Sequence, residues 1–397
     1  MINLTFLAII FAIFVSAAEI DICVPSFPAI QKIFELSAFG VEAILSINLF
    51  FHCISAVFVG YFGDRYGKKK VINTGFLIFT IGNILCCISS NYLSLMFGRI
   101  LQGIGSAAPM VLAPLFIIQI YNKEKQEKMM NTLNGICTLA ICLAPTIGSY
   151  ATLFFDWRAN FLILFILGIM SILFNKIYLP NEDIKSENQI SQFQFKNYFI
   201  ILKSKIPMMY ILSCTIGIGL YYTFVAMAPL IYIKSLGVSL KHFGFYQGSL
   251  TLTFGVFSIF SGNITKFFGK KKSLIVSLTL ILYFLLSSIF IIINNINNPL
   301  YITFTILFLS VGAVIPINFL YVAALNSIPN SQGKISAILT VLKWVFACIG
   351  IQAASYFYKE NFTSTGMVMI IMEVISLALL FIVLRIDKNF ILSEKFA

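Results

Sequence analysis

The fold is decided by a stretch that occurs twice, as Gly60-Tyr-Phe-Gly-Asp-Arg-Tyr-Gly-Lys-Lys-Lys70 and as Gly262-Asn-Ile-Thr-Lys-Phe-Phe-Gly-Lys-Lys-Lys272. The copies align without a gap at an offset of 202 residues, and two glycines and three lysines coincide. A preference for positive charge beside a membrane explains the lysines. It does not explain the glycines or their spacing, so we interpret the chain as an internal duplication.

The composition indicates a membrane protein. Of 397 residues, 59% are hydrophobic and 11% are charged, whereas a soluble domain is about half apolar and about a quarter charged. A membrane helix takes about 20 residues, so this apolar content suffices for roughly twelve. An ordinary soluble enzyme, a disordered protein and a secreted disulfide scaffold are excluded. The apolar runs are continuous and do not alternate, which also excludes a β-barrel.

The predicted fold is an all-α membrane protein with two pseudo-symmetric six-helix bundles. The predicted domains are residues 1–180 and 207–397, joined by a cytoplasmic linker at 181–206. Duplicated transporters place their site between the halves, near mid-membrane. The twelve predicted spans are 2–24, 43–63, 71–90, 94–120, 131–153, 159–179, 207–233, 244–265, 273–293, 299–326, 335–358 and 366–386.

The net charge of +12 is a topology signal. Between the predicted spans, 20 of the 27 Lys and Arg residues fall on one side and five on the other, with Arg99 and Lys343 inside spans. The more positive side is expected to be cytoplasmic, which puts both termini there. We expect no nucleic-acid partner.

The eight cysteines lie in apolar runs without a C-x-x-C pair or a histidine cluster, which predicts no metal site and no required disulfide. Residues 2–18 are similar to a signal peptide, but they lack a basic start and are followed by Glu19 and Asp21. We interpret them as part of a retained first helix.

The repeated stretch resembles the G-x-L-x-D-r-x-G-r-k-x loop of the major facilitator superfamily, and this resemblance covers nearly the whole chain. It implies that Asp64 caps a neighbouring helix and that Arg65 joins a charge relay that latches the two halves. The second copy has Lys266 and Phe267 at these places, so any relay there must differ. The implied conformational latch consists of Gly60, Gly63, Asp64, Arg65, Gly67 and Lys68.

Two further spans carry motifs similar to those of the family. Arg99-Ile-Leu-Gln-Gly-Ile-Gly-Ser-Ala-Ala108 resembles the R-x-x-q-G-x-g-a-a pattern of proton-coupled members. An arginine inside a membrane needs a partner or an aqueous cavity, although Arg99 could instead extend to the interface. In the fifth span, an antiporter-like signature is formed by Gly135, Ala144, Pro145 and Gly148. This signature implies export by antiport, and the alternative is close helix packing alone.

The end of the first span narrows the resemblance. Asp21-Ile-Cys-Val-Pro-Ser-Phe-Pro-Ala-Ile30 resembles the D-x-Y-L-P-A-L-P-x-I start of exporters related to bicyclomycin and chloramphenicol resistance proteins, with Cys23 in place of the usual tyrosine. Trp157-Arg158 is similar to the W-R of the same subgroup.

Ionisable residues inside a membrane are functional candidates, and here they are Glu19, Asp21, Arg99, Lys343 and Glu373. Glu19 and Asp21 are about 200° apart around a helix, so they cannot face one cavity equally. Structural alternatives are a solvated Asp21 near the outer end, a paired Glu373 facing the bundle, and a Lys343 that extends to the interface.

We hypothesise that Glu19 and Asp21 bind protons and sense cationic substrates, with Arg99 modulating them. Burial disfavours the charged form of a carboxyl, so such a group can take up a proton near neutral pH. Tyr221, Tyr222, Phe224 and Phe254 are candidates to line an apolar pocket, although most aromatic residues here face lipid or core.

The predicted function is proton-coupled efflux of drugs or other small amphipathic molecules across a bacterial cytoplasmic membrane. The expected partners are a small-molecule substrate, protons and the lipid bilayer. The protein is expected to act as a monomer, with the proton gradient in place of a cofactor. The alternatives are uptake or exchange of a metabolite, and a membrane enzyme or receptor. The last is disfavoured because no phosphate loop, metal cluster or nucleophile–base pair occurs.

Overall fold

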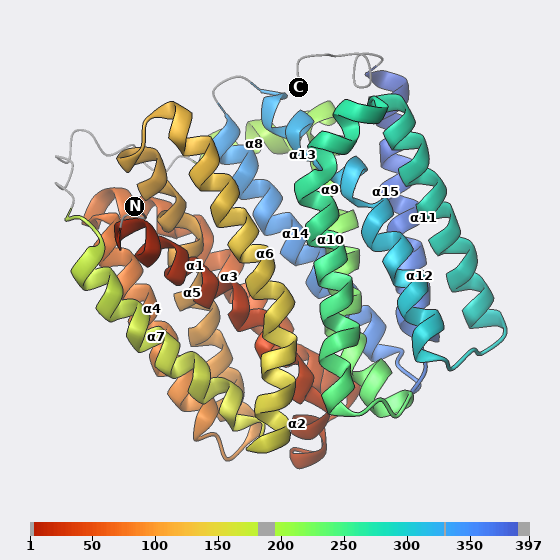
Figure 1. Cartoon of the computed structure of the whole chain (residues 1–397), viewed down its shortest axis with the longest axis horizontal. Helices are drawn as coiled ribbons and strands as arrows, with labels where there is room; N and C mark the ends of the chain where they lie inside the picture. The colour runs from red at the N-terminus through yellow and green to blue at the C-terminus, as the bar shows by residue number, and fades with distance from the viewer. Residues whose placement is uncertain (1–3, 182–194, 329–330, 388–397) are drawn as a thin grey trace. The chain divides into compact units, whose positions relative to one another are not determined.

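The computed structural model describes residues 4–181, 195–328 and 331–387. All elements in these residues are helices (Figure 1). Contacts divide the chain into two compact units, Met1–Phe193 with Ser239–Gly248, and Gln194–Val238 with Ser249–Ala397. The predicted domain boundaries stay a prediction.

The first unit is built mainly from seven α-helices and a short 3-10 helix. Helix α5 packs against α3 and α4, α4 also packs against α7, and α1 packs against α5, α6 and α7. The first span therefore lies at the centre of this unit. The elements are α1 (Leu4–Ile22), η1 (Val24–Ser26), α2 (Phe27–Ile33), α3 (Ala38–Tyr66), α4 (Lys68–Cys87), α5 (Tyr92–Ile120), α6 (Lys123–Phe154) and α7 (Arg158–Tyr178).

The second unit has a similar series of helices with two differences from the predicted spans. Helix α8 lies inside the predicted linker, and the predicted span 299–326 is broken at Ala313. The central helix α9 packs against α13, α14 and α15. The elements are α8 (Phe195–Lys203), α9 (Lys205–Pro229), the π-helical turn η3 (Leu230–Ser235), α10 (Leu240–Phe268, whose residues up to Gly248 belong to the first unit), α11 (Lys270–Ile293), α12 (Pro299–Gly312), α13 (Val314–Asn326), α14 (Gln332–Tyr356) and α15 (Thr363–Ile386).

The repeated stretch adopts the same turn in both units. Gly67 ends α3 with φ of 88° and Gly269 ends α10 with φ of 79°, and the next helix begins one residue later. Only glycine adopts this region without a steric penalty. The backbone N–H of Gly67 donates to Gly63 O at 3.1 Å, and that of Gly269 donates to Thr265 O at 2.9 Å. The coincident glycines are therefore required by the backbone.

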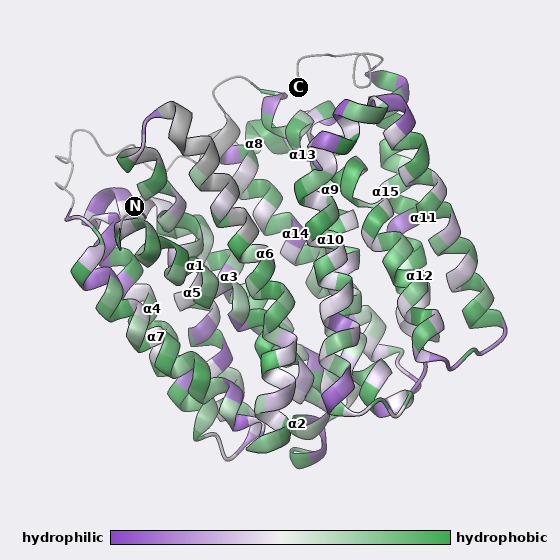
Figure 2. Ribbon diagram, viewed as in Figure 1, coloured by the Kyte–Doolittle hydropathy of each residue, from purple (hydrophilic) through white to green (hydrophobic). Residues whose placement is uncertain are grey.

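Ten helical segments of the described chain are long and apolar enough to cross a membrane. The other two predicted spans, 131–153 and 244–265, correspond to α6 and α10. In α6 the apolar part within the described residues is Leu139–Phe154. Helix α10 has 29 residues but carries buried polar side chains, among them Gln247 and Thr251. Figure 2 shows hydrophobic residues dominating the helices.

Close packing between α1 and α6 generates a testable prediction. A Cβ atom on Gly148 would overlap the carbonyl oxygen of Ile22, whereas nothing lies within 4 Å of the corresponding position on Gly60. We expect Gly148→Ala to destabilise the protein by about 1–3 kcal/mol through overpacking. Gly60→Ala, also inside a helix, should be neutral or stabilising. Thermal unfolding in detergent measures both, and equal midpoints would contradict the packing.

Candidate functional site

Helix α1 carries two buried carboxyl groups near its C-terminal end. The exposed fraction is 0% for Glu19 and 2% for Asp21. A solvated Asp21, one of the alternatives from the sequence, is therefore wrong. The following Pro25 and Pro28 lie in η1 and α2, which continue the helical segment of α1 as far as Ile33. Asp21 makes no hydrogen bond or ion pair within the described residues.

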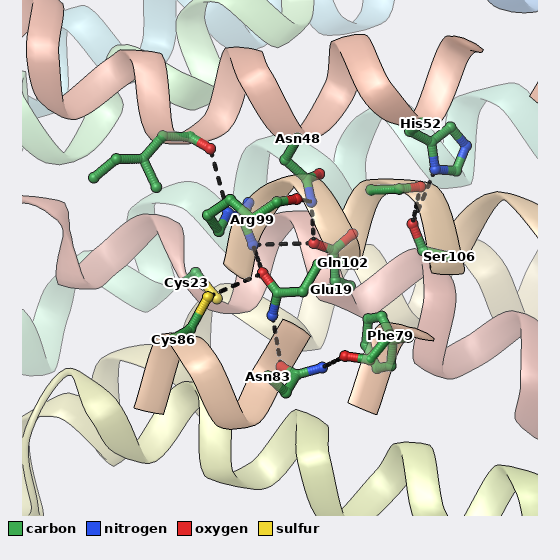
Figure 3. Close-up of polar contacts among 12 residues, drawn as sticks. Glu19, Cys23, Asn48, His52, Phe79, Asn83, Cys86, Arg99, Gln102 and Ser106 are labelled. Carbon is green, nitrogen blue, oxygen red and sulfur yellow. Dashed lines mark hydrogen bonds and ion pairs between the residues drawn. The ribbon is translucent and has the colours of Figure 1, made fainter. Parts of the chain in front are cut away.

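Glu19 forms an ion pair with Arg99 of α5. The distance from Arg99 Nη1 to Glu19 Oε1 is 3.0 Å, and both side chains are 0% exposed. Asn48 of α3 completes the contact, because its Nδ2 donates to Glu19 Oε1 at 2.8 Å and to the carbonyl of Arg99 at 3.0 Å. The alternative in which Arg99 extends to the membrane interface is therefore wrong. Three helices meet at one carboxylate oxygen (Figure 3).

A chain of amides extends this network, which we call the Glu19–Arg99 network, into α4. Arg99 Nη1 also donates to Gln102 Oε1 at 2.8 Å, and Gln102 Nε2 donates to Asn83 Oδ1 at 2.6 Å. Asn83 Nδ2 in turn donates to Phe79 O at 2.8 Å. Gln102 and Asn83 are fully buried (Figure 3). Their amides hold the guanidinium in one orientation, which a buried charge requires if it is to be stabilised.

The network leaves polar atoms without a hydrogen-bond partner in the described chain. They are Glu19 Oε2, Arg99 Nη2 and Asn48 Oδ1. Buried polar groups are nearly always hydrogen-bonded, so each such atom needs an explanation. A second acceptor or donor, such as water or a polar group of a bound molecule, would satisfy them.

Small residues of the Arg99 motif allow this network to form. A Cβ atom on Gly103 would overlap the carbonyl oxygen of Asn48 on α3, and one on Gly105 would overlap that of Gly75 on α4. The glycines thus let α3 and α4 approach α5 closely. Ser106, also in the motif, contacts Nδ1 of buried His52 at 3.0 Å.

The antiporter-like residues of α6 lie against the end of α1. Gly148 contacts Ile22, which follows Asp21, and Ala144 and Pro145 are buried. The surroundings of Gly135 lie outside the described residues. The fifth-span motif therefore packs on the helix that carries both carboxyls.

The latch residues are placed by the turn between α3 and α4. Gly63 packs on Leu112 of α5, and Arg65 Nη1 donates to Tyr61 Oη at 3.0 Å. Asp64 is half-buried and makes no hydrogen bond within the described residues. Lys69, which the motif did not single out, donates to the carbonyl of Leu179 at 2.6 Å and so ties the turn to the end of α7. The remaining latch residues are Gly60 in α3, Gly67 at the turn and Lys68 at the start of α4.

In the second unit, three of the four predicted aromatic residues gather together. Tyr221 stacks on Phe254 at 4.9 Å between ring centroids and also contacts Tyr222. Tyr222 lies 4.6 Å from Trp344, whose ring is 4.7 Å from Lys343 Nζ. Phe224 does not join them. It contacts Tyr232 and Phe362 instead and is fully buried.

Sequence reasoning missed Glu42 and Asn48. Glu42 is fully buried at the start of α3, and neither carboxyl oxygen has a hydrogen-bond partner in the described chain. It escaped because the predicted span began at residue 43. Asn48 and Asn83 are isolated amides in apolar runs, and a polar residue inside a predicted span is the signal that could have identified them as site residues. No cluster of potential metal ligands occurs in the described residues.

A family model described as Major Facilitator Superfamily matches residues 9–351. The chain is 27% identical over 243 residues to a bicyclomycin resistance protein homolog of Haemophilus influenzae, which covers 60% of this chain and 61% of that protein. It is 26% identical over 343 residues to the uncharacterized MFS-type transporter YdgK of Bacillus subtilis, covering 83% of each. It is 25% identical over 252 residues to the multidrug resistance protein MdtL of Salmonella typhimurium, covering 62% of this chain and 61% of MdtL. The chain thus matches less than two thirds of the length of the two resistance proteins.

Solved structures show the same fold at low identity. A bacterial homolog of the human lysosomal transporter Spinster has a TM-score of 0.76 at 13% identity and covers 98% of both chains. The D-xylose-proton symporter has a TM-score of 0.74 at 14% identity, and the match covers 95% of this chain and 96% of the symporter chain.

The buried ion pair predicts a non-additive pair of substitutions. Arg99→Gln should cost about 3–5 kcal/mol of unfolding free energy, because it leaves the Glu19 carboxylate buried without a counter-charge. Combining it with Glu19→Gln should recover much of this loss, since no charge then remains. Thermal unfolding in detergent measures the cycle, with exposed Arg65→Gln as the control. Additive losses would contradict the pairing.

Proposed function

The chain belongs to the major facilitator superfamily, and we propose that it exports drugs or other small amphipathic molecules in exchange for protons, by alternating access. Its family and relatives are transporters and not enzymes, and the chain is a multi-pass membrane protein. Two relatives, a bicyclomycin resistance protein homolog and a multidrug resistance protein, support a drug-like substrate. The observation that carries the proposal is the fully buried ion pair between Glu19 and Arg99.

Proton coupling follows from the ion pair. A proton on Glu19 removes the negative charge that compensates Arg99, whose other hydrogen-bond acceptors in the described residues, Gln102 Oε1 and Ile44 O, are neutral. An uncompensated buried guanidinium is costly, so protonation favours a different arrangement of α1 and α5. A cationic substrate that binds the Glu19 carboxylate would compete with the proton for the same atoms, as an antiporter requires.

We assign Asp21 a second role in the same step. Its carboxyl is buried and has no counter-charge in the described chain, so the charged form would cost several kcal/mol here. We propose that Asp21 holds a proton in this conformation and releases it when α1 moves. Gly148 packs on Ile22, the residue after Asp21, so a movement of α1 would displace the antiporter-like part of α6 directly.

The latch is proposed to transmit the change. Helix α3 carries Asn48 of the network and ends in the turn that contains Asp64 and Arg65, while Gly63 packs on α5. A shift of α5 against α3 therefore moves the turn. We also propose that this face and both termini are cytoplasmic, in a bacterial inner membrane, because 20 of the 27 basic residues lie there.

Transport in everted vesicles tests the carboxyl assignments. An imposed pH gradient should drive uptake of a cationic dye by wild-type vesicles, and Glu19→Gln and Asp21→Asn should each reduce gradient-driven transport at least about tenfold, roughly 1.4 kcal/mol of coupling. Glu35→Gln changes an exposed glutamate of the same unit and is the matched control. Undiminished coupled transport by both variants would refute the assignment.

Growth of expressing cells on a panel of dyes, antibiotics and metabolites tests the direction of transport. We expect resistance to amphipathic compounds that is lost when a protonophore collapses the gradient. Gradient-dependent accumulation of a metabolite inside cells would favour the uptake alternative. Efflux that persists with the protonophore would contradict proton coupling.

A further inference from the structure

A small pocket inside the second unit contains a single ionisable group. It lies between α9, α11, α13 and α15 and includes the carboxyl of Glu373, whose residue is 3% exposed. The polar residues beside it are Ser213 and Ser376. The rest of the lining is apolar or small, including Gly217 of α9.

The carboxyl of Glu373 has no counter-charge. It makes no hydrogen bond or ion pair within the described residues. The two serines are already engaged with each other's helix, because Ser213 Oγ donates to Ser376 O and Ser376 Oγ donates to Ser213 O, each at 2.9 Å. These bonds fix α9 against α15 and leave lone pairs, not donors, toward other groups. A paired Glu373, as one alternative from the sequence had it, is therefore not found in the described chain.

The pocket forms where the tenth predicted span is broken. Helix α12 ends at Gly312 and α13 begins at Val314, and both Ala313 and Pro316 line the pocket. Proline has no N–H, so the carbonyl of Gly312 lacks the donor that a continuous helix would give it. The helical backbone otherwise continues through Ala313, so this carbonyl is a free backbone acceptor next to a residue that lines the pocket.

The corresponding place in the first unit is occupied by a glycine whose surroundings are packed. When α7 and α15 are aligned at their first residues, Glu373 corresponds to Gly168 and Ser376 to Ser171. Gly168 is packed against Thr80 and Phe79, and a Cβ atom there would lie 3.0 Å from Thr80 Cγ2. The serine is common to both halves, whereas a glycine in the first half stands where the second has a carboxyl.

We propose that Glu373 is a second proton-binding site, independent of the Glu19–Arg99 network. A buried carboxylate without a counter-charge is costly, so the neutral acid is the form that suits this apolar lining. The proton is the ligand that we assign to this site, because it neutralises the carboxyl without bringing a further charge into an apolar lining. Loss of the proton would draw water into the pocket and separate α13 from α9.

The other ionisable groups of the surrounding helices are not among the described residues that line the pocket. On α9, the Cys214 thiol donates to Ile317 O at 3.6 Å, and Tyr210 Oη donates to Asp387 Oδ2 at 2.7 Å. On α14, Lys343 Nζ lies over the ring of Trp344, 4.7 Å from its centroid. The lysines of α11 are at its start, and α13 has no charged residue. No charged group besides Glu373 lines the pocket in the described residues.

Infrared difference spectroscopy of the whole protein in lipid nanodiscs tests this site without any transported substrate. Spectra between acid and alkaline pH should contain a protonated-carboxyl C=O band that is lost in Glu373→Gln and kept in Glu19→Gln. Glu373→Asp retains a carboxyl in the same pocket and should shift the band without abolishing it. This variant decides the question if Glu373→Gln does not fold, as judged by size-exclusion chromatography.

Two results would overturn the proposal. One is a difference spectrum that is unchanged in Glu373→Gln and Glu373→Asp, which would mean that Glu373 does not exchange protons. The other is loss of the Glu373 band when sodium chloride replaces an organic-cation chloride at constant pH, which would assign the site to sodium. A failed drug-efflux assay would leave the spectrum as predicted, so the two proposals fail separately.

Discussion

The first unit depends on one interaction, the ion pair between Glu19 and Arg99. Both charges are removed from water, and the attraction between them offsets that cost only when the geometry is good and further hydrogen-bond partners support the pair. Gln102 and Asn48 supply such partners, and they can do so only because glycines let α3, α4 and α5 approach closely. The small residues of the Arg99 motif are therefore needed for the buried ion pair to form, because they bring its partners within hydrogen-bonding distance.

This dependence makes the pair a suitable point for coupling. A single proton on Glu19 affects three helices at once, because Asn48 of α3 and Arg99 of α5 both contact the same carboxylate oxygen on α1. The same helices reach the antiporter-like residues of α6, through Ile22 and Gly148, and the turn at Gly67. A local event is thereby connected to both ends of the unit by rigid elements, which is the form that a two-state transition needs.

Much of the fold could be predicted from apolar runs, and the turns at Gly67 and Gly269 from their spacing, because both are properties of the local chain. The candidate residues Glu19 and Arg99 were predicted as isolated charges, but their partner Asn48 was not, since pairing depends on which faces meet in three dimensions. Likewise, Pro316 was the one sequence signal for the break at Ala313. Nothing in the sequence indicated that Phe224 would point away from the other three aromatic residues. Residue 42 was missed because a charge at a predicted boundary is assumed to be solvated.

The two units keep the same backbone constraints and differ in where they place charge. A turn with positive φ admits glycine and little else, so Gly67 and Gly269 are retained in both halves. Side chains inside a bundle are not constrained in this way, because neighbouring residues can repack around a smaller or larger side chain. The place of Gly168 in one half can therefore hold Glu373 in the other, provided that neighbouring residues leave space. Such asymmetry gives the second half a proton site of its own. Coupling in a duplicated transporter then need not be shared equally between its halves.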